Sequence, residues 1–204
     1  AAEAQNAGIE SKKPPQLPGS LKRSPMLDSW IRIESNGAIT VFTGKAELGQ
    51  GIKTALVQVA AEELVVDPRA ITLVTADTGR TANEGYTAGS QSMQDSATAI
   101  MHASAQVRGI LVQLASQRLG VPPGVLTVHL GVVRAKGGRS ITYGPLVTGE
   151  TLHVAAVPDP PLRDPKTRGV IGKSMQRLDI PAKVTGRAAY VQDFRLPGMA
   201  HARV

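Results

Sequence analysis

The sequence contains no cysteine, few aromatic residues and no long apolar run. Without cysteine the chain has no disulfide, no thiolate nucleophile, no zinc–thiolate site and no ligand for an iron–sulfur cluster, so such a cluster would need another chain. No run reaches the roughly 18 apolar residues of a membrane-spanning helix, and no signal-peptide pattern opens the chain. The hydrophobic content of 42% over 204 residues is ordinary for a globular protein that can bury a core.

The formal net charge of +7 is concentrated at the two ends of the chain. Residues 24–148 hold 10 basic and 9 acidic residues, whereas 149–204 hold 9 basic and 5 acidic residues. With only 3% aromatic residues, there are few side chains on which bases could stack. We therefore expect no nucleic-acid partner, and we expect the basic ends to lie over a neighbouring protein surface.

Residues 1–24 predict an extended N-terminal arm, because prolines at 14, 15 and 18 accompany few large apolar residues. A β-hairpin follows. Residues 30–34 and 38–42 alternate apolar and polar side chains around Asn36-Gly37, which indicates a two-residue turn.

The stretch 44–51, Gly-Lys-Ala-Glu-Leu-Gly-Gln-Gly, is the strongest candidate for a binding loop. It stands between the hairpin and a helix predicted at 54–64, and its glycines let main-chain N–H groups approach an anionic or polar ligand. The alternative is a tight strand-to-helix connection without a ligand. ATP hydrolysis is not expected, because Gln50 and Gly51 stand where a phosphate loop needs lysine and a hydroxyl residue. We expect Glu62 and Glu63 to face solvent on the helix.

A strand predicted at 71–75 completes a strand–helix–strand unit, for which a right-handed crossover is expected. The polar stretch 77–89 is long for a plain connection and is the second candidate site. Ser90 and Ser92 then open a long helix that is predicted to end near Leu119, followed by a short β-meander over 125–142.

The C-terminal part divides into a linker and the beginning of another domain. Prolines at 158, 160, 161 and 165 mark 149–178 as an extended linker, and 179–204 contains the first elements of a new domain. The predicted fold class is α+β: residues 25–148 form a small mixed sheet with two helices.

The residues alone predict no catalytic or metal site. The histidines at 102, 129, 153 and 201 have no metal-ligand spacing. Asp77 and Glu84 are loop acids without an evident partner, so no catalytic residue and no metal ligand is assigned.

Three segments resemble the molybdopterin-binding large subunits of the xanthine dehydrogenase and aldehyde oxidase family. Residues 44–54 with 58–64, Gln-Val-Ala-Ala-Glu-Glu-Leu, are similar to the family's glycine–glutamine cofactor segment. Residues 87–92, Thr-Ala-Gly-Ser-Gln-Ser, are similar to its second cofactor motif, and 179–199 to the entry of its α/β hammerhead domain. The hammerhead segment follows the cofactor segment here, which is the order of the isoquinoline 1-oxidoreductase-like branch.

The resemblance implies a cofactor, molybdopterin with molybdenum in a dinucleotide form, and a set of residues that hold it. Gln50 and the flanking glycines would contact the pterin, and the second motif would hold its polar edge or phosphate. The implied cofactor-binding residues are Gly49, Gln50, Gly51, Thr87, Ala88, Gly89, Ser90, Gln91 and Ser92. The family's catalytic base, a glutamate, has no matching position in this chain.

Two hypotheses for function remain. The first is the cofactor-binding part of a molybdenum hydroxylase that oxidises aldehydes or N-heterocycles with water and passes electrons to an iron–sulfur subunit with [2Fe-2S] clusters. Its partners would be the remainder of the large subunit, that small subunit and a cytochrome c acceptor, in a periplasmic or membrane-associated complex or in the cytoplasm. The second is a non-catalytic assembly or scaffold subunit that keeps the fold without the cofactor.

Overall fold

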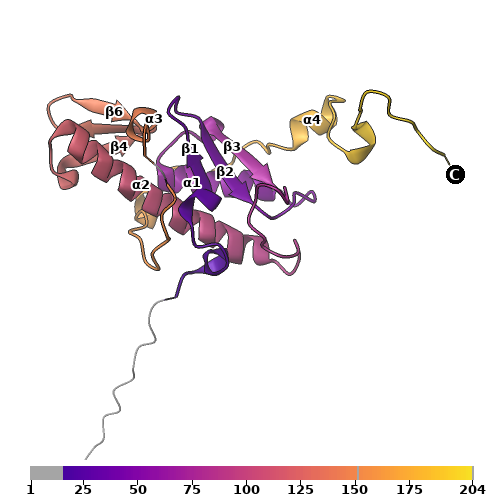
Figure 1. Ribbon diagram of the computed structural model, residues 1–204, viewed down its shortest axis with the longest axis horizontal. Coiled ribbons are helices and arrows are strands. Elements are labelled where there is room, and N and C mark those ends of the chain that lie inside the picture. Colours follow the sequence, from indigo (N-terminus) through magenta and orange to yellow (C-terminus); the bar gives the residue numbers. More distant parts are fainter. Residues whose placement is uncertain (1–15, 151, 204) are drawn as a thin grey trace, which may run out of the picture.

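The computed structural model describes residues 16–150 and 152–203. Two three-stranded sheets pack with two long helices, and a C-terminal segment extends to one side (Figure 1). The strands are β1 (Ile31–Ile33), β2 (Ile39–Thr43), β3 (Ile71–Thr75), β4 (Leu126–His129), β5 (Val132–Ala135) and β6 (Ser140–Thr142). The α-helices are α1 (Ile52–Leu64), α2 (Thr98–Leu119), α3 (Tyr143–Leu146) and α4 (Ile180–Val184). The predicted α+β class, with a small mixed sheet and two main helices, is confirmed.

The first sheet has the order β1-β2-β3, with β1 antiparallel and β3 parallel to β2. The predicted hairpin is present, but the prediction of a two-residue turn is wrong. The Glu34 N–H donates to the Ala38 carbonyl, and the Gly37 N–H donates to the Glu34 carbonyl, so the loop has three residues, 35–37. Gly37 has φ 88°, the left-handed conformation that ends such a three-residue loop.

Helix α1 connects the parallel strands β2 and β3, as the strand–helix–strand pattern predicts. It begins at Ile52, two residues before the predicted start, and its apolar face is buried against the sheet and α2. The helix ends where Val65 adopts φ 55° and donates its N–H to the Ala61 and Glu62 carbonyls.

The second long helix has a π-helical first turn, Ser92–Ala97, which continues as α2. Small residues on α2, among them Ala99, Ala103 and Ser104, are fully buried and allow α1 to pack closely. Gly120 ends the helix with φ 61°, as the sequence predicts.

The second sheet, β4-β5-β6, is the predicted meander. The hydroxyl of the buried residue Tyr143 donates to the Leu64 carbonyl at 2.7 Å and ties the end of this sheet to the end of α1. Burial raises the pKa of Tyr143 above its ordinary value, so the hydroxyl remains a donor even at alkaline pH.

The described part of the predicted N-terminal arm packs against the core. Residues 1–15 lie outside the described residues, but Gly19–Lys22 forms a 3-10 helix in which Leu21 is fully buried. A Cβ at Gly19 would clash with the main-chain oxygen of Asp95, so this helix touches the π-helical turn. Residues 19–22 are therefore not extended, because burying Leu21 outweighs the local preference.

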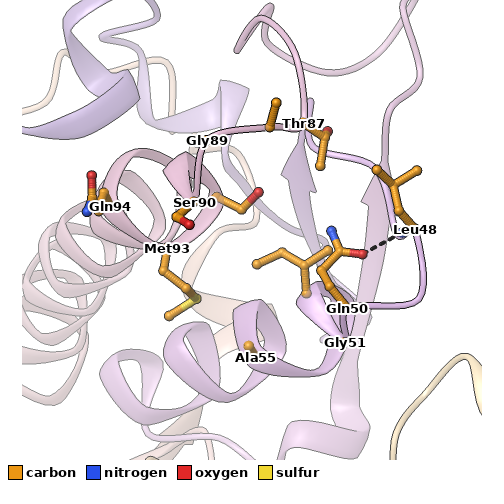
Figure 2. Close-up of a pocket in the computed structure, with 12 residues that line it drawn as sticks. Leu48, Gln50, Gly51, Ala55, Thr87, Gly89, Ser90, Met93 and Gln94 are labelled. Carbon is orange, nitrogen blue, oxygen red and sulfur yellow. Dashed lines mark hydrogen bonds between the residues drawn. The ribbon is translucent and has the colours of Figure 1, made fainter.

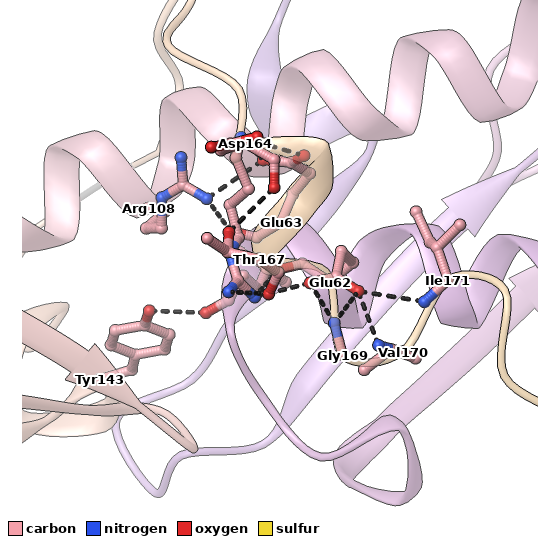
Figure 3. Close-up of polar contacts among 11 residues, drawn as sticks. Glu62, Glu63, Arg108, Tyr143, Asp164, Thr167, Gly169, Val170 and Ile171 are labelled. Atoms are coloured by element: carbon pink, nitrogen blue, oxygen red, sulfur yellow. Dashed lines mark hydrogen bonds and ion pairs between the residues drawn. The ribbon is translucent and has the colours of Figure 1, made fainter.

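The expectation that Glu62 and Glu63 face solvent is wrong, because both side chains are fully buried. The Glu62 carboxylate accepts the main-chain N–H groups of Gly169, Val170 and Ile171 (Figure 3). It also accepts a hydrogen bond from the Arg163 guanidinium at 2.6 Å. This glutamate therefore fixes part of the proline-rich linker to α1.

Glu63 fixes the same linker at a second place. Its carboxylate accepts from Arg108 of α2 at 3.1 Å and from the Arg163 main-chain N–H at 3.1 Å. The Arg108 guanidinium also donates to the Pro161 carbonyl. This stretch contains the 3-10 helix Pro165–Thr167, and these bonds hold it against α1 and α2. The domain boundaries 1–24, 25–148, 149–178 and 179–204 stay predictions.

The C-terminal segment starts next to the glycine loop in space and then extends away from the rest of the molecule (Figure 1). The Leu178 N–H donates to the Thr54 hydroxyl at 3.0 Å, and Asp179 pairs with Arg177 and Lys183. Beyond α4 the large apolar side chains are exposed, including Val191 at 89%. In the described ranges, no helix combines the length and the apolar character needed to cross a membrane.

Candidate cofactor-binding site

The two sequence motifs meet at one open pocket with a volume of about 620 Å³. Figure 2 shows the glycine loop on one side and the second loop with the π-helical turn on the other. Of the nine predicted site residues, seven line the pocket: Gln50, Gly51, Thr87, Ala88, Gly89, Ser90 and Ser92. Gly49 and Gln91 do not line it. The two motifs therefore lie close enough to contact one ligand. The contact of each residue with a ligand stays a prediction.

The glycine loop is held by hydrogen bonds within itself. The Glu47 carboxylate accepts the N–H groups of Gly49, Gly51 and Lys53. In this conformation Glu47 engages these three N–H groups, and contact between the glycine loop and a ligand stays a prediction. Gln50 was identified from the sequence, whereas Glu47 was not.

The Gln50 side chain closes the loop and borders the pocket. Its oxygen accepts the Leu48 N–H at 2.6 Å, and its amide nitrogen donates to the Ala46 carbonyl at 2.9 Å. A primary amide has two donor hydrogens and two acceptor lone pairs, so one of each remains for a ligand. Gln50 is exposed at the pocket, where it can offer this remaining pair.

The second loop is positioned by the residues that open the glycine motif. Lys45 is fully buried, and its ammonium group donates to the Glu84 and Tyr86 carbonyls at 2.8 Å and 2.9 Å. The Ala46 N–H donates to the Thr87 hydroxyl at 2.8 Å. The conformation of the second loop therefore depends on the first.

Glu84, a loop acid without an evident partner in the sequence, is buried at the base of the second loop. Its carboxylate accepts from the Thr43 hydroxyl at 2.6 Å, the Gly44 N–H at 2.7 Å and the Ser96 hydroxyl. A Cβ at Gly44 would clash with the main-chain oxygen of Ala82, so glycine is needed where the loop crosses the end of β2. No sequence signal separates Glu84 from the other acid of this loop, since each is a single acid in a polar stretch.

The start of the π-helical turn presents main-chain N–H groups without a side-chain cap. Gly89 and Ser90 both have positive φ, 63° and 58°, and Gln91 occupies the N-cap position. No side chain forms a capping hydrogen bond there, so capping by the serines is not observed. A π-helical turn pairs residues five apart, which leaves its first amides without partners inside the helix. Ser92, Met93 and Gln94, which carry the first three of these amides, border the pocket, as does Ser90.

The side chains that line the pocket are uncharged. Apolar groups come from Leu48, Ile52, Ala55 and Met93, and Met93 points toward α1 (Figure 2). A cation lies close by: the Arg177 guanidinium is about 3.7 Å from the position of a Cβ on Gly51 and 3.6 Å from Glu47.

The described residues contain no cluster of three or more acidic, histidine or cysteine side chains that could hold a metal ion. Burial lowers the pKa of His102 on α2, which lies outside the pocket. An uncharged, partly apolar pocket between an amide side chain and a helix start fits a flat polar heterocycle with an anionic substituent. Among the described residues that line it, the pocket has no paired acid and base of the kind that a complete active site would need.

A model of the molybdopterin cofactor-binding domain matches residues 11–169. A nicotinate dehydrogenase subunit from Pseudomonas putida is 38% identical over 175 residues, covering 86% of this chain and 15% of that protein. The beta subunit of isoquinoline 1-oxidoreductase from Brevundimonas diminuta is 31% identical over 215 residues, covering 86% of this chain and 28% of that protein. Among solved structures, reconstituted CO dehydrogenase from Oligotropha carboxidovorans matches with a TM-score of 0.52 and 26% identity, covering 57% of this chain and 15% of that one.

This chain belongs to the molybdopterin-binding subunits of the xanthine dehydrogenase family, as the motifs predicted. It spans less than a third of the length of these relatives.

Proposed function

We propose that this chain forms one wall of the cofactor site of a molybdenum hydroxylase that oxidises N-heterocycles or aldehydes with water. The observation that supports this proposal is that Gln50 and Gly51 line a single pocket together with 87–90 and Ser92. When bound, the cofactor supplies the molybdenum centre at which oxygen derived from water is transferred to the substrate.

The residues of this chain bind and orient the cofactor. Gln50 offers one donor and one acceptor to the pterin edge, while its bonds to Leu48 and Ala46 keep the side chain fixed. Ser90, Ser92 and the first amides of the π-helical turn hold the anionic part, because main-chain N–H groups at a helix start attract negative charge. We assign no catalytic residue to this chain, and we propose that the pterin is bound in a dinucleotide form.

The remaining catalytic parts lie on partners. We propose that these are the rest of the large subunit, a small iron–sulfur subunit with [2Fe-2S] clusters and a cytochrome c acceptor, in a periplasmic or membrane-associated complex. The exposed apolar side chains beyond α4 support a protein partner, since they include Phe194 and Leu196. Cysteine thiolates hold such clusters and this sequence has none, so the clusters would be held by cysteines outside it. Mass measurement of co-purifying chains tests the proposed partners, and cell fractionation tests the proposed location of the complex.

The alternative is a scaffold subunit without cofactor. One observation favours it: without any ligand, Glu47 and Gln50 engage the N–H groups of Leu48, Gly49 and Gly51 and the Ala46 carbonyl of the glycine loop. Molybdenum analysis of the purified native protein that contains this chain separates the two functions. A molybdenum content near one atom per chain is expected, and its absence would favour the scaffold.

A further inference from the structure

Glu47 is the one acidic side chain that lies inside the glycine loop, and its position within that loop is fixed by three hydrogen bonds. Its side chain is 5% exposed. One carboxylate oxygen accepts the Gly49 N–H at 2.8 Å and the Gly51 N–H at 2.9 Å, and the other accepts the Lys53 N–H at 3.1 Å.

These three amides together form a site for a negative charge. Gly49 and Gly51 have φ values of 102° and 87°, so their N–H groups can turn to the same side of the chain. Lys53 lies in the first turn of α1, where N–H groups lack intrahelical partners and the helix dipole favours an anion. The Glu47 carboxylate occupies the place that a phosphate takes in other glycine-rich loops.

The carboxylate remains charged in this position. Burial alone would raise the pKa of Glu47, but the N–H groups of Gly51, Lys53 and Gly49 outweigh burial and hold the pKa below its ordinary value. Arg177 lies 3.6 Å away and compensates part of the charge.

We propose that Glu47 is a positioning residue of the pocket. It fills the anion site of the glycine loop, fixes Gln50 and Gly51 at the pocket wall, and leaves the opposite loop as the place for the anionic part of the cofactor. This inference rests on the function proposed above and adds to it the residue that fixes the glycine-loop wall of the pocket.

The opposite side of the pocket supports this placement of the anionic part. There the first residues of the π-helical turn border the pocket beside Ser90 and Ser92, and no carboxylate is among the described residues that line it. Asp95, the acidic residue of that turn, does not line the pocket. A phosphate at the glycine loop would meet the Glu47 charge, whereas a phosphate at the second loop meets N–H and hydroxyl donors.

The test compares Glu47→Ala and Glu47→Gln with the control Glu34→Ala in the purified native protein. Glu34 is an exposed glutamate at the end of β1, away from the pocket lining. Two quantities are measured: amide hydrogen exchange of peptides covering 48–53, and the rate at which molybdenum is lost during dialysis. In Glu47→Ala we expect exchange in 48–53 to become about tenfold faster, as for loss of one hydrogen bond, together with faster molybdenum loss.

Glu47→Gln is the conservative variant. Its remaining side-chain oxygen can still accept from Gly49 and Gly51, so we expect exchange and molybdenum loss between those of wild type and Glu47→Ala. Wild-type exchange in Glu47→Ala would overturn the proposal, and so would faster exchange with wild-type molybdenum retention. If the wild-type protein holds no molybdenum, the proposed function fails, while the exchange measurement still decides whether Glu47 orders the loop.

Discussion

The buried ammonium group of Lys45 donates a hydrogen bond of 2.8 Å to the main-chain oxygen of Glu84. This bond joins the second residue of the glycine motif to a loop that lies beyond α1 and β3 in the chain. A second bond to the Tyr86 carbonyl and the bond from Ala46 to Thr87 extend the connection along the loop. The two cofactor motifs are therefore one structural unit, in which the first motif sets the place of the second.

We predict that Lys45→Met lowers both stability and molybdenum content. Methionine fills a similar volume but leaves the Glu84 and Tyr86 carbonyls without their donor, which costs on the order of 1–3 kcal/mol of unfolding free energy. The second loop then loses its fixed place at the pocket. Urea unfolding and molybdenum analysis check this, with the exposed residue Lys136 changed to Met as the control. A Lys45→Met protein with the control's stability and molybdenum content would show that the two loops are placed independently.

Gln50→Ala is predicted to reduce molybdenum content while the fold is kept. The side chain is exposed and makes its two hydrogen bonds within its own loop, so we expect a loss of less than about 1 kcal/mol in unfolding free energy. The ligand, in contrast, loses a donor and an acceptor at that wall. Metal analysis and turnover of the assembled protein are compared with those of Gln117→Ala, an exposed glutamine on α2. Unchanged metal content and turnover would mean that the loop is only structural.

Much of the fold follows from local patterns in the sequence. The alternation around Asn36-Gly37 specifies the hairpin, although not the length of its loop, while the apolar face of α1 and Gly120 specify a helix and a helix end. These features depend on residues close together in the chain, and the structure confirms them. The family resemblance implied that both loops contact one cofactor, and in the structure the two loops line one pocket.

Buried charges could not be predicted in the same way. Glu62, Glu63 and Glu84 are each indistinguishable from a solvated acid in the sequence, since their partners lie far away along the chain. Their burial depends on N–H groups and arginines that only the folded chain brings together. The internal use of the glycine-loop amides by Glu47 was missed for another reason: a glycine-rich loop predicts exposed N–H groups but not which anion occupies them.

Glu62→Gln is predicted to destabilise the protein mainly at neutral pH. Burial alone would raise the pKa of Glu62, but the N–H groups of Val170, Ile171 and Gly169, with Arg163, hold it below the ordinary value of 4.5. A lowered folded-state pKa stabilises the protein above the unfolded-state pKa, and this stabilisation is lost as the pH falls through the folded-state pKa. Removing the charge from a buried pair costs about 3 kcal/mol.

The pH dependence of the unfolding free energy tests whether the charge on the Glu62 carboxylate holds the linker. Unfolding free energies of wild type, Glu62→Gln and the exposed control Glu150→Gln are measured at neutral pH and at a pH below the ordinary carboxyl pKa. We expect the difference between wild type and Glu62→Gln to be large at neutral pH and to shrink in acid, with faster amide exchange over 163–171 in the variant. A difference of the same size under both conditions would show that the carboxylate charge does not hold the linker.

Ser90→Gly and Ser92→Ala are predicted to release cofactor without weakening the fold. Neither hydroxyl caps the π-helical turn, so the cost of about 1 kcal/mol that a lost N-cap brings is not expected. Ser90 has φ 58°, a conformation that glycine adopts without a Cβ penalty, so Ser90→Gly should change unfolding free energy by less than about 1 kcal/mol. Each variant removes a hydroxyl donor from the side of the pocket assigned to the anionic part of the cofactor. We therefore expect faster molybdenum loss in each variant, and faster still in the double variant.

Thermal unfolding of cofactor-free protein and molybdenum retention are measured together for both serine variants, with Ser140→Ala, at an exposed strand residue, as the control. Molybdenum retention equal to that of the control would show that neither hydroxyl contacts the cofactor. A loss of thermal stability in the cofactor-free variants would show instead that the serines cap the helix.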